Sequence, residues 1–241
     1  MGNAFCPGTK LIRQPTPEVI KCASCKGDVE IWSDELRVNC PHCHQAVVRK
    51  GPMSCLEWCT MGKECVGEEA YGKFVEQRSL NIKQQILTEL ENYFGTDAKR
   101  IAHAKAVLCA AEELLQRGGG DWHIVVPTAI LHDVGIKVAE EKYGSSAGNY
   151  QEVEGPPIVR KILLKVGLRH EHIDEICAIV AHHHSPGKDE TLNFQMLYDA
   201  DGLVNIQESI GGMDTEQKKV LIEKQFLTAA GREIAAERFL K

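Results

Sequence analysis

The sequence lacks any apolar run near the ~20 residues that would span a bilayer. Residues 1–10 lack the apolar core of a secretory signal, and Cys6 stands where an N-myristoylation site needs Ser or Thr. Basic residues are not in excess, because 28 Lys and Arg stand against 34 Asp and Glu. We therefore expect a cytoplasmic protein that does not bind membranes, and a nucleic-acid-binding surface is disfavoured.

Cysteines are unevenly distributed, since eight of the ten lie between Cys6 and Cys65. Disulfides are disfavoured in a chain without an export signal, and clustered Cys-x-x-Cys pairs are then typical of metal ligands. Helical periodicity is weak before about residue 70 and strong after it. We predict a Cys-rich zinc-binding module over residues 1–70 and an all-α catalytic domain over residues 71–241.

Two Cys-x-x-Cys pairs stand out in the first part. Cys22 and Cys25 form one pair, and Cys40 and Cys43 follow after 14 intervening residues. Each pair fits a tight turn that points two thiolates at one ion, and two such turns complete a tetrahedral Cys₄ site. Residues 29–38 suit a short hairpin between them. The pattern predicts a zinc-ribbon-like module whose structural zinc replaces the core that this region lacks.

Four further cysteines of this part have two interpretations. They could form a second metal site, with zinc or an iron–sulfur cluster, although no spacing matches a standard ferredoxin run. They could also be scattered thiols that pack against the first module. These residues are Cys6, Cys55, Cys59 and Cys65.

Capping signals and apolar spacing divide the second part into successive helices. We expect them over residues 74–94, 97–117, 126–133, 156–166, 172–184, 194–210, 215–227 and 232–240. Pro156 and Pro157 are expected to open one of these helices. Strand-like alternation is visible only near residues 29–32 and 36–38.

One short string combines an imidazole and a carboxylate, His132-Asp133, at the end of an apolar segment. Adjacent side chains diverge by about 100° around a helix axis, yet at a helix end both can reach one ion. His103 lies on the preceding long helix, at the edge of its apolar stripe, and Asp201 lies on a later helix. An isolated His-Asp dipeptide would be weak evidence because it occurs by chance.

The ordered set of His103, His132, Asp133 and Asp201 resembles the HD-domain superfamily of metal-dependent phosphohydrolases. The flanking residues agree with this resemblance over about residues 95–210. The resemblance implies an all-α HD-domain helical bundle in which these four side chains bind a divalent ion and Asp133 also orients the attacking water. The whole chain further resembles a prokaryotic subgroup of HD proteins with a Cys-rich N-terminal segment.

The resemblance also bears on residues around this set. It favours Asp201 over Asp199 as the ligand, so Asp199 is expected to support the ligands or to face solvent. Some HD proteins bind a second metal through two histidines at a helix end, which implies that His183 and His184 bind a second ion or the phosphate. His182 points away from the apolar face of its helix. The alternative for all three histidines is a polar helix C-terminus, where the dipole favours His.

One departure leaves a second metal site open. Binuclear members usually carry another His at the position of Gln151, and Glu154 could bind metal instead. Lys137, four residues after Asp133, is a candidate phosphate contact, with a solvated lysine as the alternative. Three other histidines are expected at the surface or in packing positions: His123, His170 and His172.

Hydrolysis of a phosphate ester needs an activated water and relief of charge on the phosphoryl oxygens, and a divalent ion supplies both. His and carboxylate ligands suit Mn, Fe, Ni, Co or Zn better than Mg alone. The prediction is a metal-dependent phosphohydrolase of a small phosphomonoester or phosphodiester, with a nucleotide as the expected substrate. The rivals are a di-iron oxygenase on the same scaffold and a nucleotide-sensing binding protein whose zinc ribbon recruits a partner. The family resemblance adds a homodimer as an expectation.

Overall fold

The computed structural model describes residues 14–35, 37–48, 56 and 61–240. The chain forms two compact units, Met1–Gln84 and Gln85–Lys241. The predicted division near residue 70 therefore falls inside one long helix, α3 (Glu68–Phe94), which crosses from the first unit into the second. The change in composition near residue 70 marks the end of the Cys-rich sequence, and the helix α3 continues through it.

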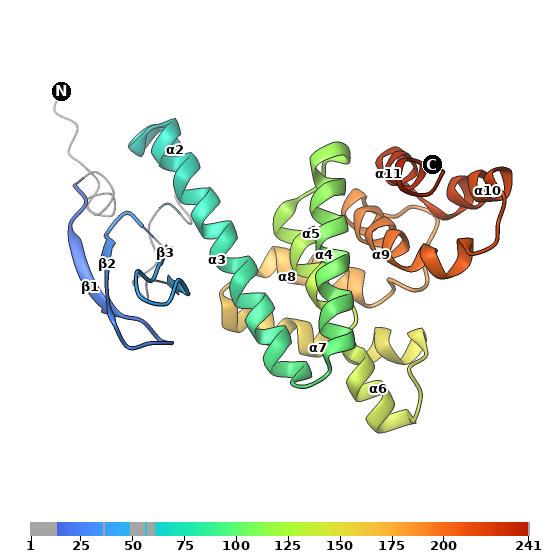
Figure 1. The fold of residues 1–241 in the computed structure, drawn as a ribbon, viewed down its shortest axis with the longest axis horizontal. Coiled ribbons are helices and arrows are strands. Elements are labelled where there is room, and N and C mark those ends of the chain that lie inside the picture. The colour runs from blue at the N-terminus through green and yellow to red at the C-terminus, as the bar shows by residue number, and fades with distance from the viewer. Residues whose placement is uncertain (1–13, 36, 49–55, 57–60, 241) are drawn as a thin grey trace. The chain divides into compact units, whose positions relative to one another are not determined.

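The described strands of the first unit form two separate antiparallel hairpins (Figure 1). These strands are β1 (Pro17–Lys21), β2 (Asp28–Trp32), β3 (Arg37–Asn39) and β4 (Ala46–Val48). Strand β2 pairs with β1, and β3 pairs with β4. The predicted hairpin across residues 29–38 is therefore wrong. A turn that brings two cysteines of a pair together also reverses the chain, so the strands on either side of each turn become partners.

Little apolar surface is buried between the two hairpins. The buried cluster consists of Cys22, Val29, Cys40 and Val47, and Ile20, Val38 and Cys43 pack against it. Three of these seven residues are cysteines, so the thiol groups themselves occupy the centre of the hairpin pair. A short helix, α2 (Gly62–Val66), precedes α3.

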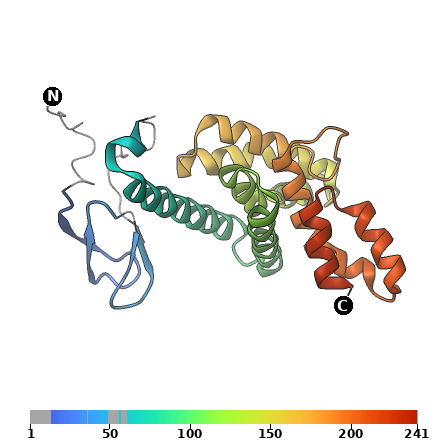
Figure 2. The ribbon, with the colours of Figure 1, turned by 90° about the horizontal axis from the view of Figure 1, so that it is seen from above.

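The second unit is helical in all of its described elements, as the sequence predicts (Figures 1 and 2). After α3 it contains α4 (Ala98–Gly118), α5 (Trp122–Leu131), α6 (Gly135–Tyr143), α7 (Gly148–Val166), α8 (His170–Val180), α9 (Leu192–Ile210), α10 (Thr215–Gln225) and α11 (Ala229–Phe239). Helix α4 packs against α5 and α9, and α7 packs against α6 and α8. Within the part of the chain that is described, no helix combines the length and apolar character needed to cross a membrane.

Helix α5 lies at the centre of this packing. Every residue from Ile124 to Leu131 is buried, which explains why the segment is a continuous apolar run and lacks a one-sided stripe. Asp121 caps its first turn by accepting a hydrogen bond from the backbone N–H of His123 (2.8 Å). The core therefore fixes both ends of the helix, and its C-terminal end carries His132 and Asp133.

Several helix boundaries differ from the predicted ones, and two of these differences concern the site. Helix α7 begins at Gly148, and Pro156 and Pro157 lie inside it. A proline removes one backbone donor and crowds the preceding turn, but the packing of α7 against α6 and α8 outweighs that local preference. Helix α8 ends at Val180 and not at His184, so the three consecutive histidines lie in the turn that follows.

Glycines allow helices α6, α7 and α8 to approach closely. A Cβ atom on Gly135 would collide with the backbone carbonyl oxygen of Gln151, and one on Gly155 would lie 2.8 Å from Cγ1 of Val180. Backbone atoms cannot move aside as a flexible side chain can. These contacts bring α7 against both segments that carry the histidines and carboxylates described next.

Candidate metal centre

Four side chains from three helical segments converge in the second unit. His103 projects from α4, His132 and Asp133 follow the last residue of α5, and Asp201 projects from α9. The Nε2 atom of His103 lies 3.1 Å from Oδ1 of Asp201 and 3.5 Å from Oδ2 of Asp133. The Nε2 atom of His132 lies 3.3 Å from Oδ2 of Asp133 and 3.7 Å from Oδ1 of Asp201. We call these residues the four-residue cluster.

Backbone carbonyls orient two of the imidazole rings. Nδ1 of His132 lies 3.0 Å from the carbonyl oxygen of Ala129, and Nδ1 of His183 lies 2.9 Å from that of Val180. A carbonyl oxygen can only accept, so each Nδ1 carries a hydrogen and each Nε2 is the ring nitrogen left to face the carboxylates. This arrangement is the usual support of a metal-ligating histidine. Nε2 of His183 is buried and has no hydrogen-bond partner among the described residues.

A second group of donors shares Asp133 with the first. Nε2 of His183 and Nε2 of His184 lie 3.5 and 3.9 Å from Oδ1 of Asp133, whereas Oδ2 of the same carboxylate faces His103 and His132. The donor atoms of each group lie within 4.8 Å of one another. Asp133 therefore presents one oxygen to each group. We call His183 and His184 the histidine pair.

The charges of these groups are strongly coupled. Burial lowers the pKa of His132, but Asp133 and Asp201 outweigh this effect and raise it to about 9. Burial raises the pKa of Asp133, yet its histidine neighbours hold that pKa well below its usual range, and His103 acts likewise on the pKa of Asp201. Burial lowers the pKa of His184. The site thus holds two carboxylates and a proton that a cation would displace.

Comparison with known proteins agrees with this geometry. Residues 100–206 match the family model of the HD domain, and this range includes the four-residue cluster and the histidine pair. We call this matched region, residues 100–206, the HD domain. A crystal structure of a predicted HD superfamily hydrolase from an uncultured Thermotogales bacterium aligns with a TM-score of 0.49 and 21% identity, over 65% of this chain and 84% of that chain. No curated protein matches the sequence.

Helix α7 fixes the turn of the HD domain that carries the histidine pair. The carboxylate of Glu152 accepts hydrogen bonds from the backbone N–H of His184 (3.0 Å) and the hydroxyl of Ser185 (2.8 Å). His182 lies outside both donor groups, and its Nε2 is 3.0 Å from the carboxylate of Glu190. The role of Glu152 was not visible in the sequence, because a glutamate on a helix gives no sign of its partner.

Two further candidates have partners away from the donor groups. The ammonium of Lys137 donates to the backbone carbonyl oxygen of Tyr93 (3.0 Å), at the C-terminal end of α3. Its predicted contact with phosphate is untested, and this bond favours a structural role. The carboxylate of Glu154 accepts from Lys142 (2.7 Å) and from the hydroxyl of Tyr143 (2.8 Å). Both bonds end on Oε1 and disfavour the suggestion that Glu154 replaces the missing histidine, which stays a prediction.

Asp199 does not face solvent, which corrects one of its two predicted roles. It is fully buried, and its carboxylate accepts from the backbone N–H groups of Leu227 (2.7 Å) and Thr228 (2.9 Å) and from the Thr228 hydroxyl (2.6 Å). Thr228 in turn caps α11 by accepting from the N–H of Gly231 (2.9 Å). Asp199 therefore ties α9, which carries Asp201, to the start of α11.

The remaining histidines of the second unit lie apart from the donor groups. The rings of His123 and His172 stack with centroids 5.5 Å apart, and His170 is exposed. These positions agree with the packing and surface roles expected for them.

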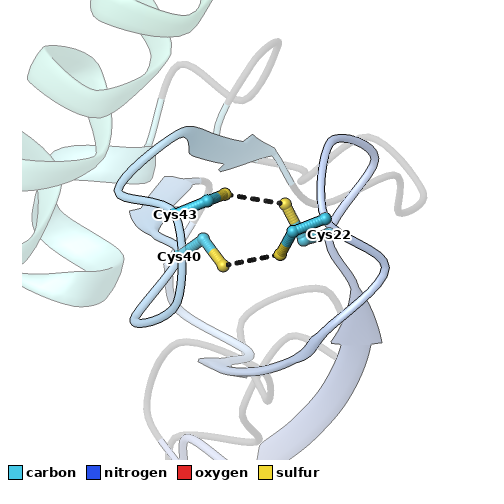
Figure 3. A group of neighbouring side chains, drawn as sticks. Cys22, Cys40 and Cys43 are labelled. Carbon is cyan, nitrogen blue, oxygen red and sulfur yellow. Dashed lines mark hydrogen bonds between the residues drawn. The ribbon is translucent and has the colours of Figure 1, made fainter.

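The first unit contains a separate candidate site of four thiols. Sγ of Cys22 lies 3.6 Å from Sγ of Cys43, and Sγ of Cys25 lies 3.6 Å from Sγ of Cys40 (Figure 3). Each short distance joins one hairpin to the other. A tetrahedral ion with Zn–S bonds of about 2.3 Å separates its sulfurs by about 3.8 Å, so the spacing fits zinc closely.

The two cysteine turns have the same backbone conformation. The residue after each second cysteine is left-handed, with φ of 63° at Lys26 and 59° at His44. The same hydrogen bond closes each turn, from the N–H of Cys22 to the oxygen of Gly27 and from the N–H of Cys40 to that of Gln45. The first unit thus presents two equivalent knuckles to one point.

The thiols share protons unequally. The backbone N–H of Cys25 is the main cause that lowers the pKa of Cys22 to about 6. The N–H of Gln45 lowers the pKa of Cys43, but burial and the neighbouring sulfurs outweigh it and raise that pKa to about 12. Four adjacent sulfurs without a cation are a mixture of thiols and thiolates, because like charges repel. Zinc binds the thiolate form, so its binding would release the remaining thiol protons.

The possible second cysteine site falls mostly outside the described residues. Cys6, Cys55 and Cys59 lie outside them, and Cys65 lies on α2 as a free thiol. Its two interpretations stay as they were predicted.

Proposed function

We propose that the HD domain is a metal-dependent phosphohydrolase that cleaves a phosphomonoester or phosphodiester, with nucleotides as the first substrates to test. The observation that carries the proposal is the orientation of the imidazole rings toward the carboxylates. Nε2 of His132 is turned by a backbone carbonyl toward two carboxylates, and His103 faces the same carboxylates from another helix. A cation satisfies all of these donors, whereas a single proton satisfies only one pair.

Each member of the four-residue cluster has a role in this proposal. His103, His132, Asp133 and Asp201 hold a divalent transition metal, for which their nitrogen and oxygen donors suit Mn, Fe, Ni, Co or Zn. When bound, such an ion lowers the pKa of a coordinated water and neutralises charge on a phosphoryl oxygen. Asp133 keeps its negative charge at neutral pH, because its pKa is depressed, and accepts a hydrogen bond that orients the attacking water.

The histidine pair has a neighbouring role. The low pKa of His184 keeps this imidazole neutral at pH 7, and Nε2 of His183 is an unpaired acceptor. Both are therefore suited to bind a second cation beside Asp133. About a quarter of the side-chain surface of His103, Asp133 and Asp201 is exposed, so a small phosphoester has access to the centre.

The thiol site of the first unit serves a structural purpose in this proposal. Cys22, Cys25, Cys40 and Cys43 would bind one zinc ion in a closed tetrahedron, without an open position for substrate. The burial of Cys22 and Cys40 at the centre of the hairpin pair supports this assignment.

The test is hydrolysis of aryl phosphates and a nucleotide panel with added Mn²⁺ or Ni²⁺, run for the wild type, His132→Ala and His123→Ala. His123 is the matched control, because it lies on the same helix outside both donor groups. We expect His132→Ala to lose the HD-site ion and turnover, and His123→Ala to keep both. Turnover retained by His132→Ala would refute the assignment.

Two additional readouts separate the rival functions. Oxygen uptake by an iron-loaded protein that hydrolyses nothing would favour a di-iron oxygenase, for which the second donor group beside Asp133 is the supporting observation. Nucleotide binding without turnover by the metal-loaded protein would favour a sensing protein.

A further inference from the structure

The side chain of Gln151 is buried in the HD domain with one half of its amide unsatisfied. It is 5% exposed, and its Nε2 donates to the backbone carbonyl oxygen of Ser146 (2.7 Å). A carbonyl oxygen can only accept, so this bond fixes the NH₂ group toward Ser146 and turns Oε1 the other way. Oε1 is buried and has no hydrogen-bond partner among the described residues. An unsatisfied buried acceptor costs about 1–3 kcal/mol, so native proteins normally give such an oxygen a hydrogen-bond donor or a cation as a partner.

The neighbours of Gln151 on α7 show which face of the helix carries its side chain. Gly148, three residues earlier, approaches the ring of His184, and Gly155, four residues later, approaches Val180. Residues at these spacings share one helix face, and a helical side chain leans toward the N-terminus. The Gln151 side chain therefore extends along the face that contacts the histidine turn, toward Gly148 and His184.

Two other contacts close the region. The carbonyl oxygen of Gln151 itself lies against Gly135, two residues after Asp133. The carbonyl oxygen of Val180 orients His183, whose Nε2 is also a buried acceptor without a partner. Two buried atoms without a hydrogen-bond partner among the described residues thus belong to adjoining segments, and one of them, Nε2 of His183, lies 3.5 Å from Oδ1 of Asp133. Acceptors cannot satisfy one another, whereas a cation satisfies both.

We propose that Oε1 of Gln151 is a ligand of a second divalent ion, together with Asp133, His183 and His184. This inference rests on the proposed metal centre and assigns one of its ligands. An amide oxygen is a neutral, hard donor and binds transition metals less tightly than an imidazole, so it favours Mn²⁺ or Mg²⁺ at this position. The two metal positions of the centre then differ in affinity. The ion at the four-residue cluster is bound tightly, and the ion at the histidine pair is bound more weakly and exchanges.

The experiment is a Mn²⁺ titration of the full chain after the HD-site ions are stripped, followed by electron paramagnetic resonance. Free Mn²⁺ gives the binding constants, and spin coupling reports two ions that share a carboxylate. The wild type is expected to bind two ions, the second more weakly. Gln151→Leu is expected to weaken only the second by about tenfold or more and to remove the coupled signal. Gln151→His is expected to tighten it.

Gln195→Leu is the matched control, since Gln195 also lies on a helix and donates through Nε2 to a loop carbonyl, that of Glu190 (2.9 Å). It should leave both constants unchanged. An unchanged second constant in Gln151→Leu, with two ions bound in the wild type, would overturn this inference alone. So would a wild type that binds a single ion. Failure of the wild type to bind any ion at the HD site would overturn the proposed function as well. Gln151→His covers the case in which the leucine variant folds poorly.

Discussion

The two candidate metal sites of this chain are built in opposite ways. The thiol site uses four cysteines from one short stretch, residues 22–43, and two hairpin turns of the same conformation point them inward. The HD centre gathers its candidate ligands from α4, the residues that follow α5, α9 and the turn after α8, across residues 103–201. Cysteine groups make up much of the core at the first site, whereas the second lies on helices that bury many aliphatic side chains of their own.

This difference separates two uses of a metal. Where the ligands are close in sequence and the apolar core is small, the free energy of metal binding contributes directly to the free energy of folding. Where helix packing holds the ligands in advance, the fold does not depend on the ion, and the ion is free to serve chemistry. The comparison predicts that metal removal unfolds one unit and only inactivates the other.

The largest expected effect is the loss of the thiol site. Cys40→Ser should abolish zinc binding and the β-structure of residues 14–48, because a structural zinc contributes about 10–16 kcal/mol to such modules. The helical unit should keep its thermal transition. Zinc content and hydrogen–deuterium exchange by region measure both outcomes. Cys109→Ser, which alters an exposed thiol on α4, is the control and should change neither outcome. Hairpin amides that stay protected from exchange in Cys40→Ser would contradict the contrast between the two sites.

The next effect concerns activity without loss of fold. Asp201→Ala should lower turnover at least ~100-fold, since even residues that only support a ligand contribute 10–100-fold. The metal-free variant should keep its fold with at most a small fall in unfolding temperature, because the attraction of Asp201 to His103 and His132 is partly offset by its burial and its repulsion from Asp133. Calorimetry and steady-state kinetics test this pair of results. Asp174→Ala removes an exposed carboxylate and serves as the reference. A large drop in unfolding temperature would show that the HD centre stabilises the fold after all.

A smaller effect is expected where the scaffold holds a ligand helix. Thr228→Ala should lower the free energy of unfolding by about 1–2 kcal/mol, because it removes a helix cap and a hydroxyl donor to the buried Asp199. Chemical denaturation measures the change. Thr215→Ala, at an exposed position at the start of α10, should have little effect. Equal losses in the two variants would contradict the role given to Asp199.

The smallest expected effect is stabilising. His44→Gly should raise the stability of the zinc-loaded first unit by about 0.5–1 kcal/mol, because a left-handed residue with a Cβ is strained by more than the added chain entropy of glycine. His42→Gly, at a neighbouring position outside the left-handed region, should be neutral or destabilising. Thermal unfolding followed at the hairpins distinguishes the two, and a destabilised His44→Gly would show that the turn is not strained.

The sequence predicted the parts of this molecule that depend on local rules or on recurring ligand types. Spacing identified the cysteine pairs, and the helical class followed from apolar periodicity. The pairing of β2 with β1 was missed because the residues of β1, Pro-Glu-Val-Ile-Lys, do not alternate between apolar and polar and none of them is fully buried. The start of α7 was misplaced because packing outweighed two prolines. Both errors concern long-range contacts, which local preference does not encode.

The same distinction applies to the candidate site. His103, His132, Asp133 and Asp201 were expected together, and the structure brings their donors within a few ångströms. The partners of Lys137, Glu154 and Asp199 were not predictable, because each depends on which helix lies opposite. The unpaired oxygen of Gln151 was not predictable either, because it depends on which groups surround a buried amide in the folded chain.

Asp133 offers the most direct test, since its carboxylate is shared by both donor groups of the HD domain. Native mass spectrometry should count the ions bound by the wild type, Asp133→Ala and Cys40→Ser after loading with Zn²⁺ and Mn²⁺. We predict that Asp133→Ala keeps the thiolate-bound zinc and loses every HD-site ion, while Cys40→Ser does the reverse. An Asp133→Ala protein that binds as many ions as the wild type would contradict the account.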